Sequence, residues 1–193
     1  MHAMRSLTRL LATLLLLAWA VAAHAEPDPP VPAPLDSVVN DYAGLLTGAE
    51  FEELQAIGDD LYAETAAPLV VVIVPSVTAF PELTAETIEA FSEEWMSYWE
   101  LADETGRGED ILIFLTVKER YLRVRLGTGY PETAQSPLQT ILVETMVPAL
   151  KEDAWADALI DGATALAALA REYFPQPPEG WVEPVEELGI AMP

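Results

Sequence analysis

Two apolar runs, the first of them uninterrupted, constrain most strongly how this 193-residue chain can fold. Residues 69–74 read LVVVIV and residues 111–117 read ILIFLTV, so neither run shows the regular polar-apolar alternation of a strand with one face in water. Strands of this composition are covered on both faces, as in sheets that lie between layers of helices. We therefore expect both runs to be central strands of one sheet.

Helical patterns supply the covering layers. A capping box of Thr47 and Glu50 opens one predicted helix, and a second helix from about Pro81 carries an aromatic stripe that includes Trp95. A third helix is predicted with Ser136 as its N-cap, and the last spans residues 153–173. Helices that alternate with buried strands predict an α/β fold: a three-layer sandwich with a small mixed β-sheet and helices on both faces.

A basic cluster coincides with a further predicted strand. Residues 121–126 alternate apolar side chains with Tyr121, Arg123 and Arg125, which predicts one wet face. Together with Lys118 and Arg120, these arginines are four of the seven basic residues that follow residue 25. Arginine on an exposed strand hinders edge-to-edge pairing and can pair with surplus acids. A second interpretation is a docking strip of Arg120, Arg123 and Arg125 for an acidic partner or an anionic headgroup.

The first 25 residues have the features of a signal peptide. Arg5 and Arg9 precede an apolar run from residue 10 to residue 23, and Ala23-His24-Ala25 offers the small residues of a cleavage site. The apolar run is about 14 residues long, whereas a membrane-spanning helix needs about 20. We expect cleavage after Ala25 and a periplasmic or secreted protein with no transmembrane segment after cleavage; the alternative is an uncleaved N-terminal anchor.

Proline-rich segments flank the predicted domain. Residues 26–35 form a linker of polyproline type that we expect to stay outside the core, and residues 175–193 form a proline-rich acidic tail. Within the tail, Trp181, Val182 and Val185 are candidates for docking on the domain surface. The folded domain is expected to span residues 36–174.

The mature chain would lack two common catalytic groups. Both histidines, His2 and His24, lie in the predicted signal peptide, and there is no cysteine. Ser-His-Asp and Cys-His catalysis and zinc sites of His or Cys are therefore excluded. Loss of residues 1–25 removes two arginines and no acid, which changes the net charge from −23 to −25. This charge argues against a nucleic-acid partner and indicates either a solubilising acidic surface, such as one adapted to a saline habitat, or a set of cation sites.

Several short motifs, in this order, resemble the TPM domain family. They are the opening VVNDYAGLLT at residues 38–47, the LVVVIV run, DILIFL at 110–115, RVRLGTGY at 123–130 and VPAL at 147–150. The resemblance covers about residues 36–173. It implies an α/β sandwich with a small sheet, calcium binding or weak acid phosphatase activity in some members, and assembly or maintenance of membrane complexes in others.

The resemblance also points to candidate site residues. Asp41 matches the acidic position of the opening motif, and Gly127 and Gly129 match the GxG loop of the family. The chain departs from the family pattern at Ser136, where an acidic residue is usual, and at Glu109-Asp110, where Asn-Gly is frequent. Glu132 stands close to the GxG loop, displaced by a proline.

Asp41, Asp110 and Glu132 are therefore candidate ligands of a hard cation. Each lies at the end of a predicted element, where loops can bring oxygen ligands together, and calcium suits an all-oxygen set. The simpler interpretation is that Asp41 caps a turn, Asp110 starts a strand and Glu132 is solvated. For the GxG loop, a turn that needs positive φ is a simpler explanation than a nucleotide site, because the third glycine of that fingerprint is missing.

Two functions remain open from the sequence. The first is a non-catalytic, exported interaction module that helps an envelope or membrane protein complex to assemble or persist, with calcium as its only candidate cofactor. The second is a divalent-cation-dependent acid phosphatase, in which the metal and the glycine amides of the GxG loop would meet the phosphate. The missing imidazole and the altered acidic positions favour the first.

Overall fold

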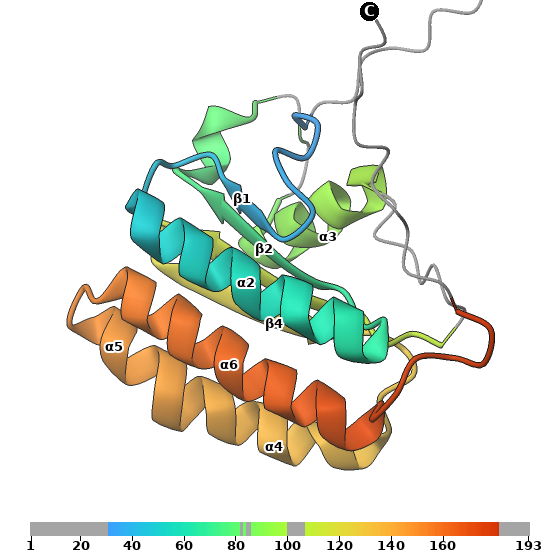
Figure 1. Ribbon diagram of the computed structural model, residues 1–193. Helices are drawn as coiled ribbons and strands as arrows, with labels where there is room; N and C mark the ends of the chain where they lie inside the picture. The colour runs from blue at the N-terminus through green and yellow to red at the C-terminus, as the bar shows by residue number, and fades with distance from the viewer. Residues whose placement is uncertain (1–30, 82, 84–85, 100–106, 182–193) are drawn as a thin grey trace, which may run out of the picture. The chain divides into compact units, whose positions relative to one another are not determined.

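The two apolar runs form the centre of a four-stranded mixed sheet. The computed structural model describes residues 31–81, 83, 86–99 and 107–181. Its strands are β1 (Val39–Asp41), β2 (Leu69–Val74), β3 (Ile111–Thr116) and β4 (Tyr121–Leu126), in the order β1-β2-β3-β4 (Figure 1). The first three strands are parallel, and β4 pairs with β3 in the antiparallel direction. Every residue of β2 and β3 is buried, as the sequence predicts.

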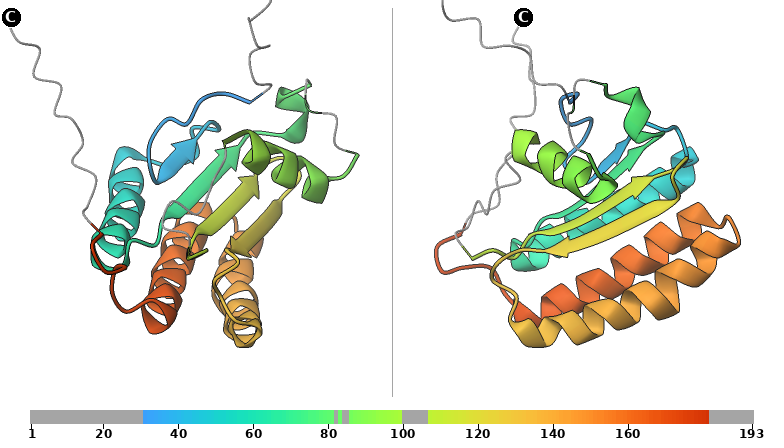
Figure 2. Two further views of the ribbon diagram at one scale, coloured as in Figure 1. Left: turned by 90° about the vertical axis from the view of Figure 1, so that its right-hand side faces the viewer. Right: turned by 180° about the vertical axis from the view of Figure 1, so that it is seen from behind.

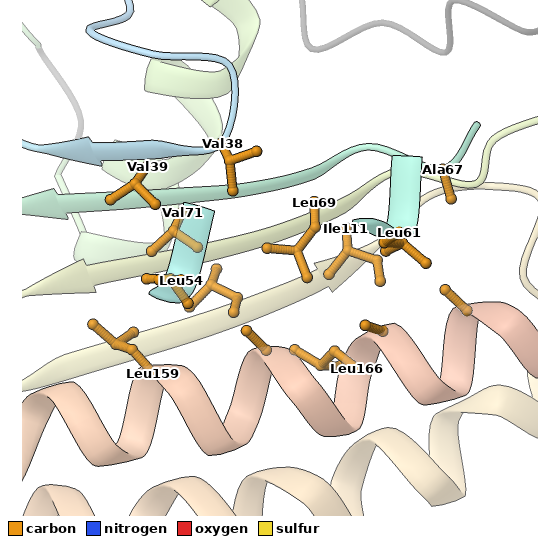
Figure 3. Packing of buried hydrophobic residues seen from close by; sticks show 14 of the residues in the cluster. Val38, Val39, Leu54, Leu61, Ala67, Leu69, Val71, Ile111, Leu159 and Leu166 are labelled. Atoms are coloured by element: carbon orange, nitrogen blue, oxygen red, sulfur yellow. The ribbon is translucent and has the colours of Figure 1, made fainter. Parts of the chain in front are cut away.

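One face of the sheet is covered by several helical segments, and we call it the aliphatic face. Figure 2 shows α2 (Gly48–Thr65), α6 (Trp155–Tyr173) and the helical run of residues 132–151 side by side on this face. That run consists of η2 (Glu132–Ala134), α4 (Gln135–Thr140), the π-helical η3 (Ile141–Met146) and α5 (Val147–Lys151). In Figure 3, leucines of α2 and α6 lie against the β2 and β3 side chains Leu69, Val71 and Ile111.

Among the described residues, the opposite face is covered by the helix α3 (Ile88–Trp99) and the short η1 (Val77–Ala79), and we call it the aromatic face (Figure 2). Here Val70, Val72 and Val74 of β2 and Leu112 and Phe114 of β3 pack against rings from α3 and from the η1 region (Val77–Ala79). Trp95 lies at the centre of these rings, fully buried, with centroid distances of 4.6 Å to Phe80 and 6.0 Å to Phe91 and Phe114. The helices on both faces confirm the predicted α/β sandwich.

The helix starts agree with the sequence in one case and differ in three. The helix expected from about Pro81 begins at Ile88. Thr47 and Glu50 form the predicted capping box at the start of α2. Ser136 is not an N-cap, because the helical run already begins at Glu132 and Ser136 lies inside α4, where its carbonyl accepts a hydrogen bond from Thr140 Oγ1. The last helix begins at Trp155 and not at Asp153, since Asp153 has a left-handed backbone with φ of 60°.

The two flanking segments are partly described. Val31 is buried in the aromatic-face cluster, so the expectation that the whole linker stays out of the core does not hold there. In the tail, the Trp181 ring packs edge-on against Tyr62 of α2 with centroids 5.5 Å apart, whereas Val182 and Val185 lie outside the described residues. The predicted signal peptide also lies outside them. Within the described part of the chain, no helix has the length and apolar character that a membrane span requires.

Candidate functional site

Asp41 caps the turn between β1 and α2. One carboxylate oxygen accepts a hydrogen bond from the Ala43 amide at 3.0 Å, and the other accepts one from the Leu46 amide at 2.9 Å. Asp41 therefore closes the loop at the carboxyl end of β1, which is the simpler of the two roles expected for it. Both of its oxygens are engaged by backbone amides.

Asp110 lies at the other end of the sheet. Asp41 is in register with Ile73 of β2, which is in register with Leu115 of β3. Asp110 precedes Leu115 by five residues, a separation of about 16 Å along the strand direction. The carbonyl of Asp110 accepts a hydrogen bond from the Gly127 amide at 2.8 Å, so this residue begins the pairing of β3 with β4.

Glu132 is exposed and begins η2, just after the loop that leaves β4, so it lies at the same end of the sheet as Asp110. The three carboxylates are thus not brought together around one point. Among the residues that the structure describes, there is no group of three or more acidic, His or Cys side chains that could hold a metal ion. A calcium site built from Asp41, Asp110 and Glu132 together does not fit this arrangement, because Asp41 lies at the opposite end of the sheet from Asp110 and Glu132.

The GxG loop is a close backbone contact. A Cβ at Gly129 would lie 1.8 Å from the Arg107 carbonyl oxygen, and a Cβ at Gly127 would lie 2.3 Å from the Gly108 carbonyl oxygen. Neither Gly127 nor Gly129 has positive φ, so the predicted reason for these glycines is wrong; the positive φ in this region belongs to Gly108, at 65°. Glycine is required here because any side chain would strike the facing backbone.

The amides of the two glycines of the GxG loop already have acceptors within the protein. The Gly127 amide donates to the Asp110 carbonyl, and the Gly129 amide donates to the Gly108 carbonyl, each at 2.8 Å. These bonds continue the antiparallel ladder of β3 and β4 beyond the ends of the strands. A phosphate would have to break them in order to bind to these amides.

Beside the loop lies a buried ion pair that the sequence analysis missed. Glu109 is 1% exposed, and its carboxylate contacts Arg107 at 2.9 Å to Nη2 and 2.5 Å to Nε. Arg107 Nη2 also donates to the Thr65 carbonyl at the end of α2, and its guanidinium stacks over the Phe174 ring at 5.3 Å. This pair ties the start of β3 to the ends of α2 and α6. No local pattern in the sequence signals it, because charges next to an apolar strand are ordinarily solvated.

Tyr130 completes this junction. Its hydroxyl donates to the Glu109 carbonyl at 3.1 Å, and its ring packs edge-on against Phe174 with centroids 4.9 Å apart. Burial, assisted by the negative charges of Asp110 and Glu109, raises the pKa of Tyr130 well above its ordinary value. Tyr130 therefore keeps its proton, and with it this hydrogen bond, to a higher pH than an ordinary tyrosine. The junction holds the amino end of β3 against the ends of α2 and α6.

A second polar cluster lies at the carboxyl end, where α/β sheets commonly bind ligands. Ser76 Oγ donates to Glu119 at 2.6 Å, and the Val77 amide donates to the other oxygen of that carboxylate at 3.4 Å. Burial raises the pKa of Glu119, but the hydrogen bonds from Ser76, from its own backbone and from Val77 outweigh that effect, so the pKa lies below its ordinary value. The charged carboxylate thus joins the loop after β2 to the β3–β4 turn.

The three arginines of the predicted docking strip do not share one surface. Arg120 contacts Asp153 at 2.5 Å, donates to the Leu150 carbonyl at 2.6 Å and stacks over the Trp155 ring at 4.8 Å, so it fastens the β3–β4 turn to the start of α6. Arg123 and Arg125, in contrast, project from β4 on the aromatic face.

The positions of Arg123 and Arg125 follow from the strand register. They are in register with Phe114 and Leu112 of β3, whose side chains belong to the aromatic-face cluster, and cross-strand partners share a face. Arg123 contacts Glu93 of α3 at 2.8 Å, and Arg125 is exposed. We call these two residues the β4 arginine pair.

Comparison with known proteins agrees with this fold. The sequence pattern of the TPM domain matches residues 39–169, and the chain belongs to this family. Among curated proteins, none matches the chain.

Solved structures share the architecture. One is the solution structure of the N-terminal domain of a protein from P. gingivalis, with a TM-score of 0.59 and 23% identity, covering 72% of this chain and 85% of that one. Another is the BA42 protein from Bizionia argentinensis, with a TM-score of 0.58 and 14% identity over 74% of this chain and 93% of that one. The N-terminal domain of cg2496 from Corynebacterium glutamicum has a TM-score of 0.51 and 18% identity over 76% and 84%. At these identities the likeness establishes the fold alone.

Proposed function

We propose that this TPM domain is an exported, non-catalytic docking module of the cell envelope, and that it binds an acidic partner through the β4 arginine pair. The observation that carries the proposal is the position of Arg123 and Arg125. They lie on the edge strand β4 of the sheet, on the aromatic face. An envelope or membrane protein complex is the proposed setting, as in family members that maintain such complexes.

Charge supports this assignment of the docking surface. The chain has 32 acidic and nine basic residues, so a pair of neighbouring arginines on one strand face is a local exception to the acidic surface. The ion pair of Arg123 with Glu93 holds that guanidinium in place at the strand edge. An acidic patch or an anionic headgroup would be steered to this point and away from the rest of the surface.

The hydrogen bonds of Asp41 and of the GxG loop support a non-catalytic role. Both Asp41 oxygens accept hydrogen bonds from backbone amides, and the amides of Gly127 and Gly129 donate to carbonyls. Catalysis by a bound cation would need carboxylates and amides that are available to ion and phosphate. Export is proposed from residues 1–25, whose basic start, apolar run and Ala-His-Ala end fit a cleaved signal peptide.

The docking proposal is tested by charge reversal. Wild-type protein and the double variant Arg123→Glu/Arg125→Glu are used as bait with detergent-solubilised native membranes. The control is Arg171→Glu, which reverses another half-exposed arginine that pairs with Glu64 away from β4. We expect a captured acidic complex to be lost with the double variant and retained with the control, and to be released by salt. Equal capture by all three proteins would contradict the proposal.

The phosphatase alternative is tested separately. Melting temperature with and without calcium, and turnover of a generic phosphomonoester, are measured for the wild type and for Asp41→Asn. We expect calcium-insensitive melting and no turnover. Turnover by the wild type that disappears in the variant would establish the enzyme and overturn the non-catalytic assignment.

A further inference from the structure

Residues 31–34, Val-Pro-Ala-Pro, lie on the aromatic face instead of leading away from the domain. Val31 is only 3% exposed and belongs to the same buried cluster as Trp95 and Phe91. The neighbouring Leu35, in contrast, is 60% exposed. One apolar side chain of the proline-rich segment is thus seated in the domain while the next is left in water.

Two aromatic side chains recognise the backbone of this segment. The indole Nε1 of Trp99 donates to the Pro32 carbonyl at 2.8 Å, and the hydroxyl of Tyr42 donates to the Ala33 carbonyl at 2.7 Å. The two rings are neighbours, with centroids 6.2 Å apart, and both pack against Trp95 at 5.6 and 5.7 Å. The carbonyls of Pro32 and Ala33 therefore accept hydrogen bonds from two rings of one packed aromatic cluster. One ring belongs to the loop after β1 and the other to α3.

The segment is chemically suited to such a site. Pro32 and Pro34 have a fixed φ, and each restricts the residue before it, Val31 or Ala33, to extended backbone. A polyproline backbone makes no internal hydrogen bonds, so its carbonyls are available to external donors. Little conformational entropy is lost when a preformed segment of this kind binds, which is why aromatic-lined sites with ring donors recur in proline-rich recognition.

The kind of contact changes after Pro34. Asn40, fully buried in β1, accepts hydrogen bonds at its Oδ1 from the Leu35 and Asp36 amides at 2.7 and 3.2 Å. These bonds turn the chain into the sheet and belong to the fold of the domain. The contacts of residues 31–34 consist instead of one apolar side chain and two carbonyls, which any segment of the form apolar-Pro-x-Pro provides.

We propose that Tyr42, Trp99 and the apolar site of Val31 form a recognition site for proline-rich segments, and that an apolar-Pro-x-Pro segment of a partner protein can displace residues 31–34 from it. The chain's own segment is the template for the ligand and its competitor. The site goes beyond the docking function proposed above and uses other residues, so either can fail without the other.

The test opens the site in the full-length chain and offers it a ligand. Val31→Asp places a charge in the buried site and should release residues 31–34, while the matched control Leu35→Asp makes the same kind of change at an exposed position. The probe is the synthetic peptide Pro-Val-Pro-Ala-Pro-Leu, which copies residues 30–35. Binding is measured by isothermal titration calorimetry in all variants. In chains that keep Trp99 it is also followed by the NMR signal of the Trp99 indole N–H, assigned with a Trp99→Phe variant.

We expect saturable binding to Val31→Asp with a shift of the Trp99 indole signal, and at least tenfold weaker binding to the wild type and to Leu35→Asp. Adding either Trp99→Phe or Tyr42→Phe to Val31→Asp should lower the affinity for the peptide by about fivefold, since each substitution removes one hydrogen bond. A peptide with alanine in place of every proline should not bind. Absence of saturable binding to the opened chain, or binding that is indifferent to the ring donors, would overturn the proposal.

A second variant covers the case in which Val31→Asp does not fold. Pro32→Gly/Pro34→Gly leaves the buried valine in place but makes the segment flexible, which weakens its hold on the site. Folding is checked by circular dichroism, and the peptide should then bind more tightly than to the wild type. Unchanged peptide affinity in this variant, or a dimer that forms through exchange of residues 31–34 between two copies, would overturn the assignment to a partner segment.

Discussion

The two faces of the sheet are built in different ways. The aliphatic face is closed by α2, α6 and the helical run 132–151, and its contacts are largely between branched aliphatic side chains and alanine. The aromatic face has α3, a cluster of rings and the short segment 31–34. Consecutive residues of β2 supply both faces equally, and every one of them is buried. The difference therefore lies in the covering layers and not in the sheet.

This difference separates stability from recognition. Several helices with close contacts to one another form a layer that is costly to open. On this face the β4 arginine pair lies on one edge strand of the sheet. The ring donors are Tyr42, just after the opposite edge strand β1, and Trp99, the last residue of α3. Both proposed binding surfaces accordingly lie on the aromatic face.

The largest effect on stability is expected on the aliphatic face, at the end of the sheet where β3 begins. Arg107→Ala leaves the carboxylate of Glu109, 1% exposed, without its guanidinium partner. We expect a loss of about 3–5 kcal/mol in the free energy of unfolding, because an uncompensated buried charge remains. Urea denaturation measures this loss. The control is Arg171→Ala, which breaks an exposed pair with Glu64 and should cost about 0–1 kcal/mol; equal losses would show that the Glu109 pair is not special.

Two adjacent valines compare the faces directly. Val71 faces the aliphatic side and Val72 the aromatic side, and both are fully buried in β2. We expect Val71→Ala to cost about 2–3 kcal/mol and Val72→Ala about 1–2 kcal/mol, because α3 and the short η1 can move toward the cavity more easily than the layer of helices on the other face. Equilibrium unfolding of the two variants gives the difference. A larger cost for Val72→Ala would mean that the aromatic face is the more rigid one.

The starts of the covering helices give a smaller contrast. Thr47 and Glu50 cap α2 reciprocally, with the Thr47 amide donating to Glu50 at 2.7 Å, whereas Thr87 only accepts from the Ala90 amide at 3.1 Å at the start of α3. Thr47→Ala should therefore cost about 1–2 kcal/mol and Thr87→Ala about 0.5–1 kcal/mol. Thermal unfolding of both variants checks the order. If Thr87→Ala proved the more damaging, α3 would depend on its cap more than on its ring contacts.

The smallest expected effect is a pH dependence in the alkaline range. Burial raises the pKa of Tyr42 to about 12, from an ordinary value of 10.0. Between these values the unfolded chain releases a proton that the folded chain keeps, so the free energy of unfolding should fall as pH rises from about 10 to about 12. The slope should be shallower in Tyr42→Phe, with the remaining slope due in part to Tyr130 at the aliphatic face. An unchanged slope in urea titrations would contradict this role of Tyr42.

Several features of the fold followed from local sequence alone. The runs 69–74 and 111–116 are central strands because continuous branched apolar residues leave no wet face, and Thr47 with Glu50 marks a helix start because the pair satisfies backbone amides locally. The prediction of Ser136 as an N-cap was wrong for a related reason. Ser136 is a residue type that commonly caps helices, but the preceding residues 132–134 already form a helical turn.

The candidate site shows what local sequence patterns do not predict. Asp41, Asp110 and Glu132 each lie at the end of an element, as expected, yet the parallel order of β1 and β3 places Asp41 at one end of the sheet and Asp110 at the other. Element ends are visible in a sequence, whereas the end of the sheet at which each one falls depends on strand direction and register.

The sequence by itself determined which segments leave water, the α/β class and the resemblance to the TPM domain family. Only the tertiary structure decided that Gly127 and Gly129 face a neighbouring backbone, that Glu109 is buried with Arg107, and that Val31 is part of the core. The physical reason is the range of the interactions. Hydrophobic periodicity and capping act within a few residues of chain, while ion pairs, backbone contacts and the docking of residues 31–34 on Trp99 join positions that meet only after the sheet has formed.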